Sequence, residues 1–267
     1  MAKIAVPEIV DRKRRGEPIT MLTAYDFPTA RIVDRAGIDL ILVGDSVGMV
    51  CLGYPDTVPV TLEEMIHHTA AVARAVERAL VVGDLPFLSY QVSAEQAVLS
   101  AGRLVKEGRA DCVKLEGGRS QADKVEAIVR AGVPVMGHIG LTPQTATQLG
   151  GFKVQGRDPE AARALMEDAK ALEAAGAFAV VLECVPSRLA ARITQSLSIP
   201  TIGIGAGPRC DGQVLVLHDL VGLFDRFVPK FVKRYADLGA EMRKAVEAFR
   251  DEVRSGAFPS GEHEFSD

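Results

Sequence analysis

The sequence predicts one (β/α)8 barrel, a parallel eight-stranded barrel with outer helices, and three features support this fold class. The chain has 267 residues, and an α/β barrel takes about 250 residues. Eight short apolar runs recur along the chain, as expected for parallel strands that are covered on both faces. Helical patterns lie between these runs, and alternation of strand and helix indicates a parallel sheet. Eight repeats favour a closed barrel over an open sheet.

Each strand is expected at one apolar run. In chain order the predicted strands are Ile19–Ala24, Leu40–Val43, Ala79–Val82, Cys112–Leu115, Val133–Met136, Ala179–Leu182, Thr201–Ile204 and Val214–Leu217. The segments between the strands carry helix start and stop signals. Thr61 and Glu64 have the spacing of a capping box. Asp158 before Pro159 is typical of a helix start, and Gly176 closes the same helix.

The chain is predicted to form one domain over residues 1–267, because no low-complexity linker divides it. Its last part, about 233–267, lies beyond the eighth predicted strand. Lys233–Val253 has the pattern of one long helix. The tail Gly256–Asp267 is rich in glycine, proline and charged residues, so we expect an extended segment that is either docked on a neighbour or mobile.

Charge and cysteine content exclude several classes of protein. Lys and Arg number 31 against 35 Asp and Glu, and no basic stripe extends beyond Arg12–Arg15, so we expect no nucleic-acid partner. The four cysteines lack paired spacing, which favours reduced thiols in a cytoplasmic protein over a disulfide frame or a zinc site. We see neither an apolar signal segment nor an apolar run near the ~20 residues that cross a bilayer, and expect no membrane association.

Ionisable side chains follow or end five consecutive predicted strands, the second to the sixth. They are Asp45, Asp84, Lys114 with Glu116, His138, and Glu183. The carboxyl ends of barrel strands meet at one mouth, where active sites are assembled. On the fourth strand, Lys114 and Glu116 lie two residues apart and so point the same way, as does Cys112. A polar inward face is costly unless its groups are paired, hydrated or bound to a metal.

Each of these residues also has a purely structural interpretation. Aspartates after strands are often helix caps, and a Lys and a Glu at a barrel mouth can form a structural ion pair. A single His is more often a packing residue, and Glu183 can be a charge at the rim. The repetition over five strands is what favours a functional site. Gly203–Gly207, after the seventh strand, either cradles a phosphate or forms a tight turn.

The types of side chain at the predicted mouth favour enolate chemistry. Two or three carboxylates without a nearby Cys or His pair indicate a hard cation such as Mg²⁺. A lysine close by can hold the carboxylate of a substrate, and an isolated glutamate can act as a base. A metal that chelates a 2-oxo acid stabilises the enolate and so acidifies the adjacent C–H bond.

Several ordered blocks resemble the 3-methyl-2-oxobutanoate (ketopantoate) hydroxymethyltransferase family over nearly the whole chain. The blocks are Thr20–Asp26, Val43–Met49, Gly83–Phe87, Val113–Gly118, Gly137–Gln144, Gly150–Gly156, Gly203–Gly207 with Asp211–Gln213, and Pro229–Tyr235. The resemblance implies transfer of a hydroxymethyl group from 5,10-methylenetetrahydrofolate to 3-methyl-2-oxobutanoate, giving 2-dehydropantoate in pantothenate biosynthesis. It also implies a (β/α)8 barrel, Mg²⁺ as the metal, and homo-oligomers that are commonly decamers.

The same resemblance implies roles for individual residues. It implies metal ligands at Asp45, Asp84 and Glu116, and substrate-binding residues at Asp45, Ser46, Asp84 and Lys114. Glu183 matches the position of the proton acceptor, and His138 lies in a motif of the mouth with an accessory role.

Three other interpretations remain open at the level of sequence. A metal-dependent 2-oxo-acid C–C lyase of a related barrel type uses similar carboxylate clusters, and turnover of a longer hydroxy acid without folate would indicate it. A Schiff base on Lys114 keeps the aldol step without the metal, and borohydride trapping with indifference to EDTA would indicate that mechanism. A scaffold without enzymatic activity would bind neither a divalent metal nor a 2-oxo acid.

Overall fold

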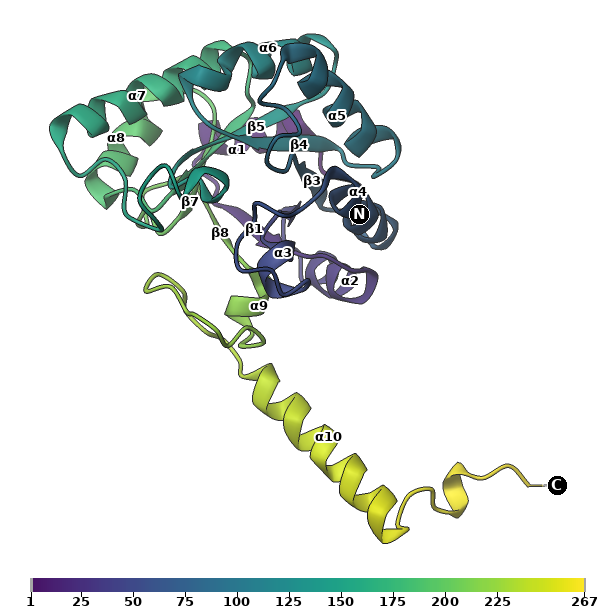
Figure 1. Ribbon diagram of the computed structural model, residues 1–267. Helices are drawn as coiled ribbons and strands as arrows, with labels where there is room; N and C mark the ends of the chain where they lie inside the picture. The colour runs from purple at the N-terminus through teal and green to yellow at the C-terminus, as the bar shows by residue number, and fades with distance from the viewer. Residues whose placement is uncertain (1, 267) are drawn as a thin grey trace. The chain divides into compact units, whose positions relative to one another are not determined.

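The computed structural model describes residues 2–266 (Figure 1). The chain forms two compact units, Met1–Val216 and Leu217–Asp267, and each is described by itself. The prediction of one domain over residues 1–267 stays a prediction, and its two terminal residues lie outside the described part.

The first unit is a closed barrel of eight parallel strands in sequence order, which confirms the predicted fold class (Figure 1). The strands are β1 (Ile19–Thr23), β2 (Leu40–Val43), β3 (Leu80–Asp84), β4 (Cys112–Glu116), β5 (Val135–Gly140), β6 (Ala179–Glu183), β7 (Thr201–Ile204) and β8 (Gly212–Leu215). Because all strands run in the same direction, their carboxyl ends lie at one mouth of the barrel.

Some strand boundaries differ from the predicted ones, and the differences bear on the mouth. β3, β4 and β6 extend one or two residues further than predicted and end at Asp84, Glu116 and Glu183. β5 begins two residues later than predicted, after Pro134, which has no N–H to donate to a neighbouring strand. β8 is Gly212–Leu215, two residues earlier than predicted. The charged residues are therefore the last residues of three strands.

Helices cover the outside of the barrel. In the first unit they are α1 (Val6–Arg15), α2 (Phe27–Arg35), α3 (Val47–Val50), α4 (Leu62–Ala75), α5 (Ala94–Lys106), α6 (Ala122–Arg130), α7 (Pro159–Ala174) and α8 (Ser187–Ser196), with 3-10 turns η1 (Arg119–Gln121) and η2 (Pro143–Thr145). Thr61 and Glu64 form the predicted capping box at the start of α4. Asp158 caps α7 as predicted, with its carboxylate accepting a hydrogen bond from the Ala161 N–H.

The amino end of the barrel is closed by α1. Ile4 and Ile9 belong to the same buried cluster as the inward side chains of the strands. Asp39, directly before β2, pairs with Arg12 of α1 (2.8 Å) and with Arg78 (3.1 Å). This end of the barrel is therefore packed and charge-paired.

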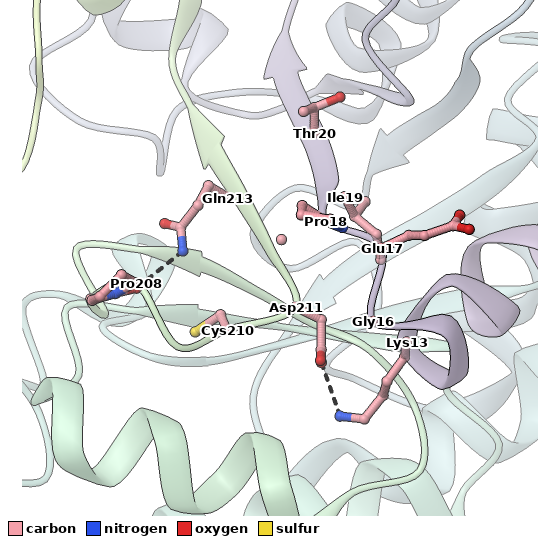
Figure 2. Close-up of a pocket in the computed structure, with 12 residues that line it drawn as sticks. Lys13, Gly16, Glu17, Pro18, Ile19, Thr20, Pro208, Cys210, Asp211 and Gln213 are labelled. Carbon is pink, nitrogen blue, oxygen red and sulfur yellow. Dashed lines mark hydrogen bonds and ion pairs between the residues drawn. The ribbon is translucent and has the colours of Figure 1, made fainter.

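The alternation of strand and helix breaks once, between β7 and β8, because residues 205–211, all described, contain no helix. Asp211 anchors this short link. Its carboxylate accepts a hydrogen bond from the Thr201 N–H (2.8 Å) and pairs with Lys13 Nζ at 2.9 Å (Figure 2). A cavity of about 610 Å³ lies here, lined by residues of the link, of the end of α1 and of the first residues of β1 and β8. The missing helix leaves Thr20 and Gln213 exposed on the outer face of the barrel.

The second unit contains α9 (Leu217–Leu220), α10 (Leu238–Ser255) and the 3-10 turn η3 (Gly261–His263). The predicted long helix is correct in kind, but it starts at Leu238, five residues later than Lys233, directly after the N-cap Asp237. No residue of α10 is buried within this unit. The predicted extended tail contains η3, and its last residue lies outside the described part. Among the described residues, no helix combines the length and apolarity needed to cross a membrane.

Candidate active site

The inward faces of neighbouring strands change from apolar to charged toward the mouth. On β3, Val82 belongs to the buried core and Asp84 follows on the same face. On β4, Cys112 lies in the core, as predicted, and Lys114 and Glu116 follow it on the same face. All three charged side chains are buried, so each needs a partner within the protein.

The next two strands continue this pattern. Met136 of β5 and Val181 of β6 lie in the core, and His138 and Glu183 follow them on the same face. The strand register places Glu116 directly beside His138. The structure thus brings together all six charged residues that were predicted at the mouth, namely Asp45, Asp84, Lys114, Glu116, His138 and Glu183.

Lys114 and Asp84 form a buried ion pair. Lys114 Nζ lies 2.7 Å from each carboxylate oxygen of Asp84. Burial favours the neutral amine, but the charges of Asp84, Glu116 and Asp45 outweigh it and raise the pKa of Lys114 above its usual value. This shift favours the protonated amine, which suits an anionic substrate.

Asp45 and Ser46 lie just after β2. The Asp45 N–H donates a hydrogen bond to Asp84 Oδ2 (3.3 Å), which places the two aspartates side by side. Burial, together with the charges of Asp84 and Glu116, raises the pKa of Asp45 well above its usual value. Ser46 Oγ lies 2.8 Å from the hydroxyl of Tyr25. A cation bound near both aspartates would offset the repulsion that raises the pKa of Asp45.

His138 lies between two carboxylates. Its Nδ1 is 3.3 Å from Glu116 Oε1, and its Nε2 is 3.2 Å from Glu183 Oε2. Neither contact has hydrogen-bond alignment, so both are ion-pair contacts. Burial and Lys114 disfavour the charged imidazole, but Glu116 and Glu183 outweigh them and raise the pKa of His138 to about 9. The imidazole of His138 thus lies between Glu183, the predicted base, and Glu116, a predicted metal ligand, and the accessory role of His138 stays a prediction.

Glu183 is followed by a residue in an unusual backbone conformation. Cys184 has φ 49°, in the left-handed region, which costs a non-glycine residue about 1–2 kcal/mol. Backbone hydrogen bonds hold it, since its N–H donates to the Ile204 carbonyl and its carbonyl accepts from the Gln155 N–H, both at 2.9 Å. Strain of this kind is often found at functional sites. Here the left-handed residue, Cys184, directly follows Glu183 and ends the extended conformation of β6.

Two further residues of the site are not predicted by sequence. Gln144, in η2, donates a hydrogen bond from Nε2 to Asp45 Oδ2 (2.9 Å), and its backbone N–H donates to Glu116 Oε2 (3.1 Å). The hydroxyl of Tyr90 lies 2.9 Å from Gln144 Oε1 and accepts a hydrogen bond from the Glu116 N–H (3.1 Å). Gln144 is the last residue of Gly137–Gln144, one of the blocks that carry the family resemblance, and this position could have marked it as a candidate site residue. Nothing in the local sequence points to Tyr90.

The donor set fits a divalent cation that prefers oxygen ligands. Four carboxylates share the site with two cationic groups, Lys114 and His138, so ionised carboxylates leave excess negative charge. Mg²⁺ is commonly held by one or two protein carboxylates, with waters and substrate completing its shell, and Asp45 and Asp84 suit that role. Over residues 2–266, no three His, Cys, Asp or Glu side chains are grouped as ligands of one metal ion. Glu116 already faces His138 and Gln144, and its role as a third ligand stays a prediction.

The cavity beside the β7–β8 link is lined by none of the charged residues of the mouth. We place the active site at the mouth, because buried charges at the carboxyl ends of barrel strands are the usual catalytic arrangement. The fold and this cluster define a (β/α)8-barrel enzyme with an acid–base site assembled from β2 to β6.

Comparison with known proteins identifies the particular family. The family profile described as Ketopantoate hydroxymethyltransferase matches residues 3–261, and the chain belongs to this family. It is 63% identical to the 3-methyl-2-oxobutanoate hydroxymethyltransferase of Moorella thermoacetica, over 99% of this chain and 98% of that protein. It is 61% identical to the enzyme of the same name from Enterococcus faecalis, over 96% of this chain and 93% of that protein. The chain is therefore a hydroxymethyltransferase of pantothenate biosynthesis, and this class replaces the lyase and scaffold interpretations.

Solved structures of low sequence identity share the fold. Phosphonopyruvate hydrolase, in a complex with oxalate and Mg²⁺, has a TM-score of 0.60 at 15% identity, over 98% of this chain and 93% of that chain. A 2,3-dimethylmalate lyase of the PEP mutase/isocitrate lyase superfamily has a TM-score of 0.63 at 17% identity, over 100% of this chain and 92% of that chain. At these identities the likeness supports the barrel fold alone.

Proposed function

We propose that this chain transfers a hydroxymethyl group from 5,10-methylenetetrahydrofolate to 3-methyl-2-oxobutanoate, giving 2-dehydropantoate, through the enolate of the oxo acid. The observation that carries the proposal is the division of the mouth into two parts. Asp45, Asp84 and Lys114 form one part, which suits a cation and an anionic substrate. Glu183, bridged by His138 to Glu116, forms the other and suits a base.

The residues have distinct tasks in this proposal. Lys114 neutralises the substrate carboxylate, while Asp45 and Asp84 hold Mg²⁺. When bound, Mg²⁺ supplies the Lewis acidity that stabilises negative charge on the keto oxygen. Glu183 removes the proton from C3, so the C–H bond breaks and the proton moves to a carboxylate oxygen.

The second half of the reaction forms the new carbon–carbon bond. The methylene carbon is bonded to two folate nitrogens, and both bonds break in the reaction. The first C–N bond opens to give an iminium ion, and the C3 carbon of the enolate then bonds to the methylene carbon. The second C–N bond breaks as water supplies the hydroxyl oxygen of the product, and the two nitrogens take up the proton from C3 and one proton from water. His138, which contacts both Glu183 and Glu116, holds the Glu183 carboxylate in place during these steps.

The test is deuterium exchange at C3 of 3-methyl-2-oxobutanoate in D₂O, followed by NMR with Mg²⁺ and with EDTA. Exchange that needs the metal but no folate would support enolate formation at this site. Product formation on addition of 5,10-methylenetetrahydrofolate would then support the donor. Absence of exchange with metal, folate and folded protein all present would overturn the proposed mechanism.

We also propose that the protein forms homo-oligomers, with the decamer as the size that the family resemblance suggests. Exposed apolar side chains recur every three or four residues along one face of α10. They are Leu238 (43% exposed), Met242 (59%), Val246 (61%), Phe249 (57%) and Val253 (48%). An apolar helix face of this kind suits burial against another subunit. A cytoplasmic location is also proposed, because the four cysteines lack the paired spacing of a disulfide frame.

A further inference from the structure

We infer that Gln144 positions the metal-binding carboxylate of Asp45, and that Tyr90 anchors Gln144 for this task. The inference rests on the proposed metal site and deepens it, because neither residue is a proposed ligand, base or substrate contact. Gln144 and Asp45 are 99 positions apart in sequence. They meet because η2 follows β5 and Asp45 follows β2, so both lie at the mouth of the barrel.

The partners of the Gln144 amide define its orientation. Nε2 donates two hydrogen bonds of 2.9 Å, one to Asp45 Oδ2 and one to the Leu85 carbonyl. Oε1 faces the Tyr90 hydroxyl at 2.9 Å and the donor Gln91 Nε2 at 3.3 Å. The Tyr90 hydroxyl lies equally close, at 2.9 Å, to the Glu116 carbonyl and shares its one proton between the two acceptors. An amide turned the other way would set oxygen against oxygen on one side and nitrogen against donors on the other. The amide therefore presents a donor to Asp45 in one fixed direction.

The same two residues also hold Glu116. The backbone N–H of Gln144 donates to Glu116 Oε2, and the Tyr90 hydroxyl accepts from the Glu116 N–H. Gln144 and Tyr90 are 3% and 1% exposed, so water does not replace these contacts readily. Substitution of the Gln144 side chain removes the contact with Asp45 and keeps the backbone contact with Glu116. The two contacts can therefore be tested separately.

A fixed carboxylate binds a cation more tightly than a freely rotating one. With Oδ2 held by the amide, the plane of the Asp45 carboxylate is set before the cation arrives, and less rotational freedom is lost on binding. Partners that orient metal ligands in this way typically change metal affinity about 10- to 100-fold when they are removed.

The experiment measures binding of Mn²⁺, used as a paramagnetic probe in place of Mg²⁺, to the full-length protein by electron paramagnetic resonance. Gln144→Met preserves the length of the side chain and removes its donor. We expect its Kd for Mn²⁺ to rise about 10- to 100-fold with unchanged stoichiometry. Tyr90→Phe removes the hydroxyl that contacts Gln144 and the Glu116 backbone, and should raise the Kd in the same direction, by a smaller factor. Gln96→Met is the control for the loss of a glutamine amide, because the Gln96 amide bonds the Val92 N–H and the Leu88 carbonyl, away from the carboxylates.

The outcomes separate this inference from the proposed function. A raised Kd in Gln144→Met beside an unchanged Kd in Gln96→Met would support it. A wild-type Kd in Gln144→Met would overturn it and leave the proposed metal intact. If Gln144→Met does not fold, as judged by circular dichroism, Tyr90→Phe decides, and an unchanged Kd in that variant overturns the inference. Failure of the wild-type protein to bind Mn²⁺ overturns the proposed metal and the inference together.

Discussion

Replacement of Lys114 by methionine tests whether the buried ammonium offsets the charge of the acidic cluster. The side chains of Lys114 and Asp84 are 4% and 2% exposed, and Nζ donates to both Asp84 oxygens at 2.7 Å. Two hydrogen bonds between charged groups, at about 1.5–3 kcal/mol each, amount to about 3–6 kcal/mol. Removal of one partner of a buried pair typically costs about 3–5 kcal/mol. We therefore expect Lys114→Met to lower the free energy of unfolding by about 3–5 kcal/mol at neutral pH.

The pH dependence of this loss has a defined sign. Burial raises the pKa of Asp84 and Lys114 lowers it, so without Lys114 the folded-state pKa of Asp84 lies further above its unfolded value. A carboxyl group with a raised folded-state pKa destabilises the fold when it is ionised, so the loss in Lys114→Met should shrink as the pH falls.

The assay is urea unfolding followed by circular dichroism, at fixed protein concentration and with EDTA present, at neutral and mildly acidic pH. The control is Lys244→Met, because Lys244 and Glu241 form an ion pair in which both side chains are about two-thirds exposed. Such a pair contributes about 0–1 kcal/mol. A loss in Lys114→Met no larger than in this control, or one that grows as the pH falls, would refute the reasoning.

Three further predictions concern the base, the closed end of the barrel and assembly. Glu183→Gln should nearly abolish deuterium exchange at C3, measured by NMR, while 3-methyl-2-oxobutanoate still binds in calorimetry; normal exchange would eliminate Glu183 as the base. Burial alone would raise the pKa of Asp39. Hydrogen bonds from Thr20 and Arg78, together with the charge of Arg12, outweigh burial and hold this pKa below 3.8. The stability that Asp39 contributes is therefore present above pH 3.8 and is lost as the pH falls through the lower folded-state value. The difference in urea midpoint between wild type and Asp39→Asn should accordingly disappear in acid, and a difference independent of pH would contradict this. Val246→Glu should dissociate the oligomer in sedimentation velocity, whereas Ala248→Glu, on another face of α10, should not; intact assembly in Val246→Glu would argue against the proposed interface.

The barrel itself could be predicted from sequence because its signal is local and repeated. Runs such as Leu40–Val43 and Thr201–Ile204 are apolar without alternation, since both faces of these strands are covered, and their predicted bounds are the observed ones. The missing helix between β7 and β8 was not predicted. The link between β7 and β8 is held by the ion pair of Asp211 with Lys13, which are far apart in sequence. The periodicity of a strand carries no information about such contacts.

The candidate site was predicted in part. Asp84, Glu116 and Glu183 end their strands, and the parallel barrel rule alone places such residues at one mouth. The pairing of the charged side chains could not be predicted in the same way. The purely structural interpretation of the sequence was an ion pair between Lys114 and Glu116, whereas in the structure Lys114 bonds Asp84 of the neighbouring strand.

The sequence alone determined the fold class, the mouth that carries the charges and the family resemblance, because strand periodicity, strand-end position and ordered motifs are all properties of local sequence. The tertiary structure decided the partners, namely Lys114 with Asp84, His138 between Glu116 and Glu183, and Gln144 on Asp45. Partners across a barrel depend on strand register and side-chain direction. These are fixed only when the whole sheet closes, because the free energy of burying a charge depends on every group packed around it.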